Sequence, residues 1–256
     1  MKLIELHILQ SFPVSCLNRD DVGAPKTATF GGVERARLSS QCLKRAVRLA
    51  AAEEAPGFEG VRSRFLKSPF IAALVSAGLT ESDAAAKADE ICAAFRKQDA
   101  KNKDQVTTAV YLSPGEIGQI AQAIYAGEDV KKAIKKAQRL DAADIALFGR
   151  MVANDATLNV EGAAMFSHAL STHKASNDID FYSAVDDRKA DAEDAGAGMI
   201  GTLEFTSATY YRYAAVNLGL LADDDHLGAL SPGQRREVLK SFIKACLMAV
   251  PGARKN

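Results

Sequence analysis

The side chains with the clearest chemical pattern lie in one predicted helix near the N-terminus. Gln41, Lys44 and Arg48 follow one another at spacings of three and four residues, which places them on one face of an α-helix. Ser39 or Ser40 offers the N-cap, so the helix would also direct free backbone N–H groups and the positive end of its dipole toward an anion. Such groups suit the successive phosphates of a single polynucleotide strand, although an ordinary solvated basic face has the same pattern.

Further cations precede this helix. Lys26 and Arg37 lie in a stretch rich in Pro, Gly and charged residues, and we predict one long loop from Ser11 to Arg37. From Arg19 to Arg48 the sequence has seven Lys/Arg and three Asp/Glu, a net charge of +4 in a chain whose formal net charge is zero. A local excess of positive charge is what a polyanion would require. Lys26 and Arg37 are therefore candidates to join the helix in binding phosphates.

A second charged segment, which is acidic, lies far along the chain. From Asp178 to Asp194 there are seven Asp/Glu and two Lys/Arg, a net charge of −5, and we predict a hairpin or loop that protrudes between Asp178 and Gly201. Phe181 and Tyr182 are adjacent aromatics on this polar arm, and they need a domain surface or an unstacked base to pack against. Both charged segments could be ordinary solvated loops. Alternatively, the basic segment is a site for a polyanion, and the acidic segment contacts a neighbouring copy of the chain.

The sequence offers little that could support catalysis. His168 and His173 are five residues apart on a predicted strand, so their side chains should point to opposite faces. The acid pairs Asp20-Asp21 and Asp186-Asp187 could attract Mg²⁺, but no third ligand and no general base accompany them. No cysteine or carboxylate spacing matches a zinc or two-metal site, and no nucleophile motif is found. We therefore expect no catalytic residue, no metal and no cofactor.

Composition places the chain among ordinary globular proteins. It is 48% hydrophobic and 25% charged and has no run of about eighteen apolar residues, so no membrane-spanning helix is predicted. The N-terminus has an acid and a histidine within its apolar run and no cleavage signature, which makes it a poor signal peptide. The four cysteines have no paired spacing and are interpreted as reduced thiols. We expect a cytoplasmic protein without a membrane partner.

The elements that must position these residues follow from the periodicity of the sequence. Alternation predicts strands, and apolar stripes behind a cap predict helices. Thr80 with Asp83 and Ser113 with Glu116 are cap patterns, whereas Phe30-Gly31-Gly32 predicts a tight turn. The predicted elements are a strand at Leu3–Leu9, a helix from Ser39 or Ser40 to about Ala52, a wholly helical block at about 60–150, strands at Ala164–His173 and Thr202–Val216, and a helix that starts at Ser231.

This order predicts an α+β fold. Strand, helix, strand, strand and helix form a ferredoxin-like domain with the topology of an RNA recognition motif, interrupted by a helical insertion and a protruding hairpin. The last strand of such a domain should follow the second helix, but the sequence ends six residues after Val250. A sheet edge would then stay unpaired. We therefore expect that a β-rich C-terminal portion is absent from this sequence.

Eight segments, taken in order, resemble one known family. They are Ser15–Asp21, Phe30–Gly32, Arg37–Ala46, Asp144–Met151, Ala169–His173, Asp178–Asp187, Gly201–Phe205 and Tyr211–Ala214. In these segments the chain resembles the backbone subunit of the type I-E CRISPR Cascade complex, the CasC family. The similar segments span most of the chain, whereas the helical block at 60–139 matches only loosely.

The resemblance implies a non-catalytic protein that binds CRISPR guide RNA in a ribonucleoprotein for antiviral defence. Copies would line up head to tail along the guide beside other Cascade subunits, and the free bases of the guide would pair with target DNA. The implied fold has the shape of a right hand with an RNA-recognition-motif-like palm. Its parts would be 1–58 (palm), 59–151 (helical fingers), 152–177 (palm), 178–201 (thumb) and 202–256 (palm, which continues further in the family).

The resemblance also implies roles for individual residues. Met151 would be a wedge on the fingers, and Phe181, Tyr182 and Ser183 would form the wedge of the thumb, which pushes out a base at regular intervals. The first thumb aromatic of the family is usually bulkier, and Phe181 stands in its place because this chain has no tryptophan. The RNA-binding residues near the first palm helix would be Arg19, Lys26, Arg37, Ser40, Gln41, Lys44 and Arg48.

Two other functions stay open at this point. A CRISPR RNA-processing endonuclease with a related palm would need a general base, for which His7, His168 and His173 are the candidates. A helical protein-interaction module would bind no nucleic acid at all.

Overall fold

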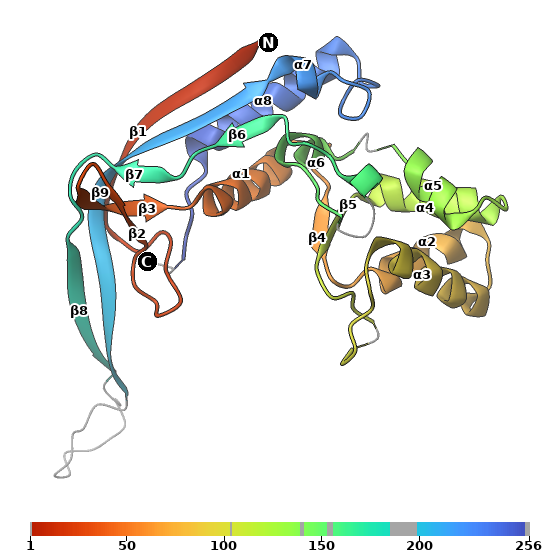
Figure 1. Cartoon of the computed structure of the whole chain (residues 1–256), viewed down its shortest axis with the longest axis horizontal. Coiled ribbons are helices and arrows are strands. Elements are labelled where there is room, and N and C mark those ends of the chain that lie inside the picture. Colours follow the sequence, from red (N-terminus) through yellow and green to blue (C-terminus); the bar gives the residue numbers. More distant parts are fainter. Residues whose placement is uncertain (1, 103, 139–140, 153–155, 185–198, 254–256) are drawn as a thin grey trace. The chain divides into compact units, whose positions relative to one another are not determined.

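The structure of the chain is a computed structural model that describes residues 2–102, 104–138, 141–152, 156–184 and 199–253. It is a mixed α/β protein whose described residues form a large antiparallel sheet and eight α-helices (Figure 1). The chain divides into two compact units. The sheet unit consists of Glu5–Val47, Phe166–Ala214 and Leu247–Asn256, and the helical unit consists of Met1–Ile4, Arg48–Met165 and Ala215–Cys246.

The large sheet has seven strands in the order β1-β9-β7-β3-β2, and β6 and β8 also pair with β9. The long strand β9 is thus the centre of the sheet, and the strand predicted at Thr202–Val216 is confirmed in a longer form. The strands and the helix beside them are β1 (Leu3–Ser15), β2 (Thr27–Phe30), β3 (Val33–Leu38), β6 (Ala164–Phe166), β7 (Ala169–Ser171), β8 (Asn177–Ala184), β9 (Met199–Asn217) and α1 (Ser40–Glu54).

The sheet unit buries one face of its sheet. Along β1, exposed and half-buried residues alternate, as predicted for a strand with one face toward a core. Leu43 of α1 packs with Leu38 of β3 and Tyr210 of β9 in one apolar cluster, so α1 covers this face. Successive side chains of a strand point to opposite faces. Arg37 and Tyr211 therefore project from the face that α1 does not cover.

The long loop predicted at Ser11–Arg37 is wrong. Its residues extend β1 and form the antiparallel hairpin β2–β3, in which Phe30 pairs with Val33. Gly31 and Gly32 occupy the turn at φ +66° and +78°, the left-handed region where glycine has no Cβ to clash. The predicted tight turn is therefore confirmed, and a Gly-Gly pair between two short β-prone runs is itself a hairpin signal.

β8 and the first part of β9 form an antiparallel arm, which extends beyond the other strands of the large sheet in Figure 1. Its register runs from the pair Asn177–Thr206 to the pair Ala184–Met199. The hairpin predicted at Asp178–Gly201 is confirmed for these two strands.

The helical unit contains a bundle with its own core. Phe70 and Phe95 stack with ring centroids 6.2 Å apart, and Leu74, Ile91 and Ile120 are buried in the same cluster. Burial of these large apolar side chains is the main force that holds the helices together. None of the described helices has both the length and the hydropathy needed to span a bilayer. Apart from α1, the α-helices among the described residues are α2 (Lys67–Ala77), α3 (Glu81–Phe95), α4 (Pro114–Tyr125), α5 (Val130–Lys136), α6 (Ala143–Phe148), α7 (Leu218–Leu221) and α8 (Pro232–Met248).

The predicted helix starts are confirmed by their caps. The side chains of Thr80 and Ser113 each accept a hydrogen bond from the N–H three residues further on, at the starts of α3 and α4. Before α8, the Ser231 hydroxyl accepts from the N–H of Gln234, and the Gln234 side chain accepts from the N–H of Ser231. This reciprocal pair is a capping box.

Two parts of the predicted pattern are wrong. The block predicted as wholly helical also contains a two-stranded sheet of β4 (Val61–Ser63) and β5 (Val110–Leu112), runs too short for a clear alternation. The strand predicted at Ala164–His173 is broken into β6 and β7, and His168 lies in the break. His168 and His173 are thus not on opposite faces of one strand.

Candidate nucleic-acid interface

The first turn of α1 is held by side chains from distant segments. The N–H of Ser39 donates to Oδ1 of Asn18 at 2.9 Å, and the N–H of Ser40 donates to Nδ1 of His168 at 3.1 Å. The N–H of Cys42 donates to Oγ of Ser39 at 3.3 Å. The expectation of free N–H groups is therefore wrong for these three donors. An anion bound beside this turn would be held chiefly by side chains.

Gln41 and Lys44 lie one turn apart on α1, and both are accessible. Gln41 is exposed, and Lys44 is half-buried with its ammonium 6.0 Å from the centroid of the Phe166 ring. This cation–π contact steadies the lysine without neutralising its charge. An amide and a cation in this arrangement can bind adjacent oxygens of a phosphate chain.

Arg48 belongs to the helical unit and makes contacts there. Its Nη1 donates to the carbonyl of Gly60 at 3.3 Å, and its guanidinium carbon lies 5.5 Å from the centroid of the Tyr111 ring. The Tyr111 hydroxyl donates in turn to the buried carboxylate of Asp144 at 2.5 Å. Arg48 is half-buried and engaged by two neighbours, so its side chain has less freedom than that of Lys44 to follow a phosphate.

Replacing Asp144 with asparagine should change how stability depends on pH. Burial raises the pKa of the Asp144 carboxyl, and this outweighs the opposing hydrogen bonds from Tyr111, Ile145 and Gly60 and the charge of Arg48. A raised pKa means that the folded state holds the proton more tightly. The resulting stability is present below the unfolded pKa of about 4 and is lost as the pH rises through the folded value.

The free energy of urea unfolding, measured for the native chain and for Asp144→Asn from pH 3 upward, checks this expectation. The native chain should lose stability relative to the variant as the pH rises from about 4. A difference between the two proteins that stays constant over the acidic range would contradict it.

The loop between β1 and β2 is built around Asp20. Its Oδ1 accepts from the N–H of Val22 at 3.0 Å and from that of Ala24 at 2.9 Å. A carboxylate used in this way holds a loop, which gives Asp20 a structural role. Among the described residues, no group of three or more His, Cys, Asp or Glu side chains could hold a metal ion. Two predicted cations border the loop: Arg19, which is exposed, and Lys26, which is half-buried.

Arg37 is placed differently from the other predicted cations. It lies on β3, and strand alternation turns its side chain away from the face that α1 covers. Its N–H donates to the carbonyl of Lys26 at 2.8 Å, whereas its Nε is buried without a hydrogen-bond partner. The structure therefore does not bring Arg37 together with Gln41 and Lys44, because the sheet lies between them.

The arm presents its two aromatics on opposite faces. Tyr182 pairs with Gly201 of β9, and its ring lies so close that a Cβ on Gly201 would fall 2.6 Å from Cζ of the tyrosine. Tyr182 thus covers the glycine and stiffens the strand pair. Phe181 is 64% exposed on the other face, and Ser183 beside it is exposed as well. The ring of Phe181 is accessible and can insert between bases, whereas the ring of Tyr182 packs against the arm itself.

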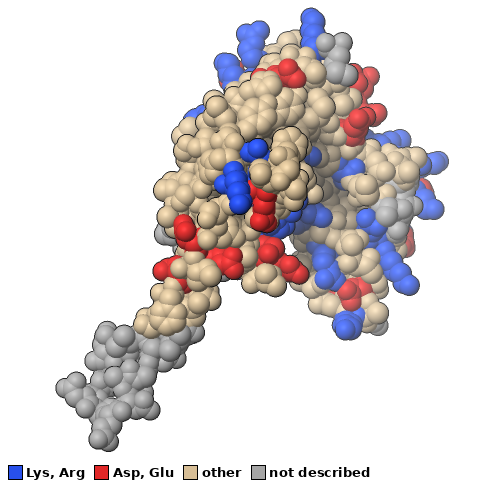
Figure 2. All heavy atoms as spheres, turned by 60° about the vertical axis from the view of Figure 1, so that its left-hand side comes forward, with Lys and Arg blue, Asp and Glu red and all other residues tan. Residues whose placement is uncertain are grey.

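Acidic side chains gather around the base of the arm (Figure 2). Asp178, Asp180 and Glu204 are the carboxylates on the described parts of its two strands. The segment 185–198, which includes the acid pair Asp186-Asp187, lies outside the described residues. Because these carboxylates repel phosphates, a polynucleotide would meet the arm through its aromatic side chain rather than along its acidic base.

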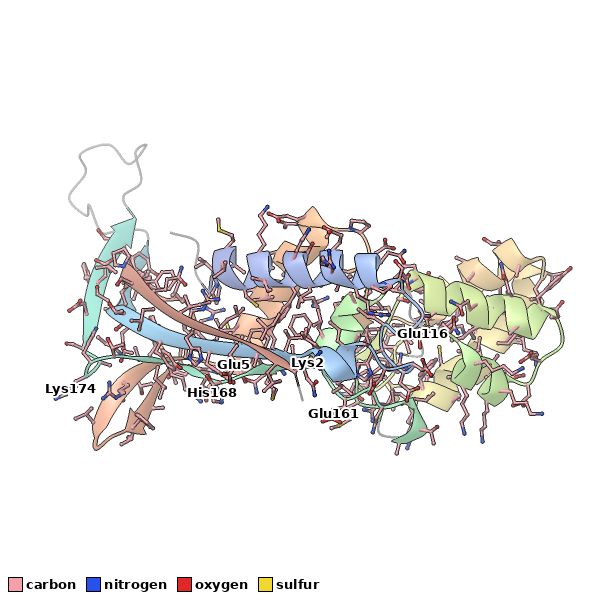
Figure 3. The ribbon with its side chains drawn as sticks, turned by 90° about the horizontal axis from the view of Figure 1, so that it is seen from above. Lys2, Glu5, Glu116, Glu161, His168 and Lys174 are labelled. Atoms are coloured by element: carbon pink, nitrogen blue, oxygen red, sulfur yellow. The ribbon has the colours of Figure 1, made fainter. Side chains whose placement is uncertain are left out.

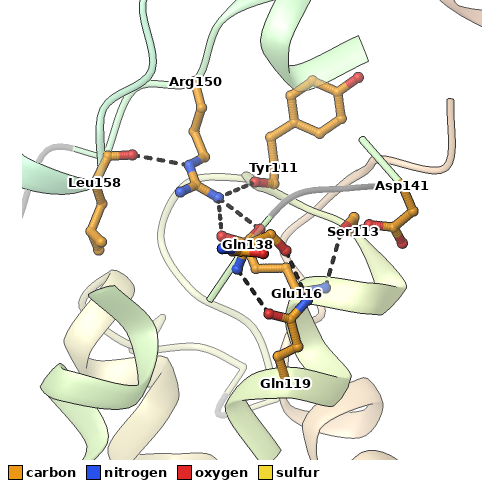
Figure 4. Close-up of polar contacts among 8 residues, drawn as sticks. All are labelled: Tyr111, Ser113, Glu116, Gln119, Gln138, Asp141, Arg150 and Leu158. Atoms are coloured by element: carbon orange, nitrogen blue, oxygen red, sulfur yellow. Dashed lines mark hydrogen bonds and ion pairs between the residues drawn. The ribbon is translucent and has the colours of Figure 1, made fainter. Parts of the chain in front are cut away.

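Met151 is 77% exposed, and it follows Arg150, which forms a buried ion pair with Glu116 (Figure 4). Nη1 of Arg150 lies 2.8 Å from both carboxylate oxygens of Glu116, and the two side chains are 1% and 0% exposed. Nε of Arg150 donates to the carbonyl of Leu158 at 3.1 Å, and Nη1 also donates to that of Tyr111 at 3.3 Å. An exposed methionine is therefore attached to a firmly anchored residue.

The backbone before Met151 is fixed as well. Gly149 has φ +81°, and a Cβ at this position would lie 2.9 Å from the carbonyl oxygen of Val160. Arg150 and Val160 exchange two backbone hydrogen bonds of 2.9 Å. These contacts leave one backbone conformation for the chain that presents Met151.

The three histidines proposed as general bases are each engaged in hydrogen bonds. Nδ1 of His7 lies 2.7 Å from the hydroxyl of Tyr211, and Nδ1 of His168 accepts from the first turn of α1. Nδ1 of His173 lies 2.9 Å from the carbonyl of Lys174. Figure 3 labels His168 and Lys174 at separate places along the sheet unit. Each of these hydrogen bonds fixes the orientation of its imidazole ring.

The chain resembles known proteins both in its sequence and in its structure. The profile of the family described as "CT1975-like protein" matches residues 4–256. A solved chain described as "CRISPR RNA-guided surveillance complex, pre-nicking" is 29% identical with a TM-score of 0.80, covering 98% of this chain and 73% of that chain. Another, described as "CRISPR RNA-guided surveillance complex", is 26% identical with a TM-score of 0.68 and the same coverage. None of the curated proteins matches.

Proposed function

Since this chain belongs to the CT1975-like protein family, we propose that it is a non-catalytic backbone subunit that binds CRISPR guide RNA in a surveillance complex for antiviral defence. The observation that carries the proposal is its 29% identity, over 98% of its length, to a chain of a complex described as RNA-guided. The complex is of type I-E and acts in the cytoplasm, where the four cysteines stay reduced thiols.

In this proposal the sheet unit is a palm like an RNA recognition motif, the helical insert forms the fingers, and the arm of β8 and β9 is the thumb. Gln41 and Lys44 bind phosphates of the guide from α1, assisted by Arg19 and Lys26 from the adjoining loop. This role is supported by the accessibility of these side chains and by the cationic character of the segment. Arg48 supports the helix that carries them through its contacts in its own unit.

Phe181 and Met151 displace bases of the guide. Both side chains are exposed, and each follows a segment whose backbone is held by close contacts. Copies of the chain associate head to tail, and the bases between displaced positions pair with target DNA. In this proposal the protein therefore contacts the sugar-phosphate backbone of the guide, and base pairing provides the sequence recognition.

Replacing both Lys26 and Lys44 with alanine should weaken RNA binding equally for unrelated sequences. Each lysine that neutralises a phosphate of a single strand adds about 0.7 to the slope of log affinity against log salt. Loss of two such contacts should therefore make that slope shallower by about 1.4. Filter binding of three unrelated oligoribonucleotides at several salt concentrations measures both quantities.

Lys132→Ala with Lys135→Ala is the matched control, since it removes the same charge from the exposed side of α5. It should leave the slope close to that of the native chain. Equal effects from the two double variants would point to general charge attraction and count against a site at α1.

A further inference from the structure

One row of side chains crosses four strands on the face of the sheet opposite α1. Arg37 of β3 pairs with Leu170 of β7, and Leu170 pairs with Tyr211 of β9. Nδ1 of His7 on β1 lies 2.7 Å from the Tyr211 hydroxyl and extends the row to a fourth strand. Neighbouring strands are about 4.8 Å apart, so the row is about 14 Å long. These residues, together with Tyr213, are called the Tyr211 face.

The aromatic rings of the Tyr211 face are held in place by one another. The His7 ring lies 5.2 Å from that of Tyr213 and 6.1 Å from that of Tyr211, between ring centroids. The Tyr213 hydroxyl donates to Glu5 at 2.7 Å. Tyr211 is still 42% exposed and His7 is exposed, so the rings are pre-ordered and accessible together.

This combination of accessible rings and a nearby cation suits unstacked bases. Every base has an aromatic face that can stack on a tyrosine or histidine ring, which needs no specific sequence. Arg37, at the end of the row, is half-buried and carries a charge that a phosphate would complement.

We infer that the Tyr211 face is a second binding surface for single-stranded nucleic acid, on which bases stack against Tyr211 and His7 while Arg37 contacts a phosphate. This surface is separate from the one at α1 and the arm, because it lies on the other side of the sheet. Its ligand is a strand whose bases are unpaired, whether RNA or DNA. The proposed function does not require it, and the inference does not depend on that function.

The chain lacks tryptophan, which allows a direct test. The Tyr211→Trp variant keeps an aromatic ring in the row and supplies a single fluorophore. Adding oligouridylate or oligothymidylate should quench its emission with saturation, because stacked bases quench indole fluorescence. The RNA and the DNA probe together tell which polynucleotide the face prefers.

Phe181→Trp serves as the companion variant, since it reports on the arm instead. Quenching of Trp at 211, with or without quenching at 181, supports the inference. Quenching at 181 alone overturns it and leaves the proposed function intact. An emission at 211 that changes with protein concentration in the absence of nucleic acid also overturns it, because the face then binds another copy of the chain.

Affinity measurements on two variants distinguish a loss of base stacking from a general disturbance of the fold. Tyr211→Leu keeps an apolar side chain in the strand but removes the aromatic face, so binding of the preferred probe should weaken roughly tenfold. Tyr211→Phe keeps the ring, loses only the hydroxyl that meets His7, and should bind nearly as well as the native chain. Equal losses in both variants would overturn a stacking role.

Discussion

Replacing Glu116 with glutamine should destabilise the helical unit by about 3–5 kcal/mol, since it leaves the buried guanidinium of Arg150 without a counter-charge. The ion pair is 1% and 0% exposed, so water cannot replace the lost carboxylate. The two carbonyls that also accept from Arg150 offer only partial charges. Urea unfolding followed by circular dichroism measures the loss as a lower midpoint at an unchanged slope.

The same substitution at Glu237 provides the control. Glu237 pairs with Lys240 at 2.8 Å on the surface of α8, with side chains 68% and 64% exposed. Because solvent screens such a pair, Glu237→Gln should change stability by less than about 1 kcal/mol. Similar unfolding midpoints for the two variants would show that the buried pair does not stabilise the fold, and Met151 would lose its proposed anchor.

Replacing Phe181 with alanine should preserve the fold but erase the regular protection pattern on bound guide RNA. Stacking of a base on an aromatic ring is worth about 1–3 kcal/mol, and the exposed ring of Phe181 makes no comparable contribution to the folded chain. Phosphate contacts at α1 would persist, so overall affinity should fall less than the periodicity. Nuclease footprinting of the RNA complex, together with an unfolding curve, measures both.

Substitutions at two neighbouring positions serve as controls for the footprint. Ile179→Ala removes a side chain that is 72% exposed on the same face of β8 as Phe181, and the pattern should survive. Tyr182→Ala uncovers Gly201 and should loosen the arm itself. If Ile179→Ala blurs the footprint as much as Phe181→Ala, general apolar contact with the arm would replace base insertion as the explanation.

Local signals in the sequence predicted much of the secondary structure. The caps at Thr80, Ser113 and Ser231 act within three residues, so their chemistry can be read directly from neighbours in the chain. The alternation of β1 and the strand β9 were predicted for the same reason. The hairpin β2–β3 was missed because β2 has only four residues, and because the Gly and charged residues around it are typical of a loop.

The contacts that organise the candidate site join distant segments, and no periodicity encodes them. Glu116 and Arg150 are each unremarkable in sequence, and only folding reveals that they neutralise one another. Likewise, Asn18 and His168 complete the first turn of α1 from two other parts of the chain. The grouping of Arg37 with Lys44 failed for a related reason, because neighbours in sequence can project from opposite sides of a sheet.

The unequal roles of Tyr182 and Phe181 give the arm a front and a back. One ring is folded down over Gly201, and the other projects from the reverse side. In the proposed function, a base could stack only against the face of the arm that carries Phe181, so each copy would have to present that face to the guide.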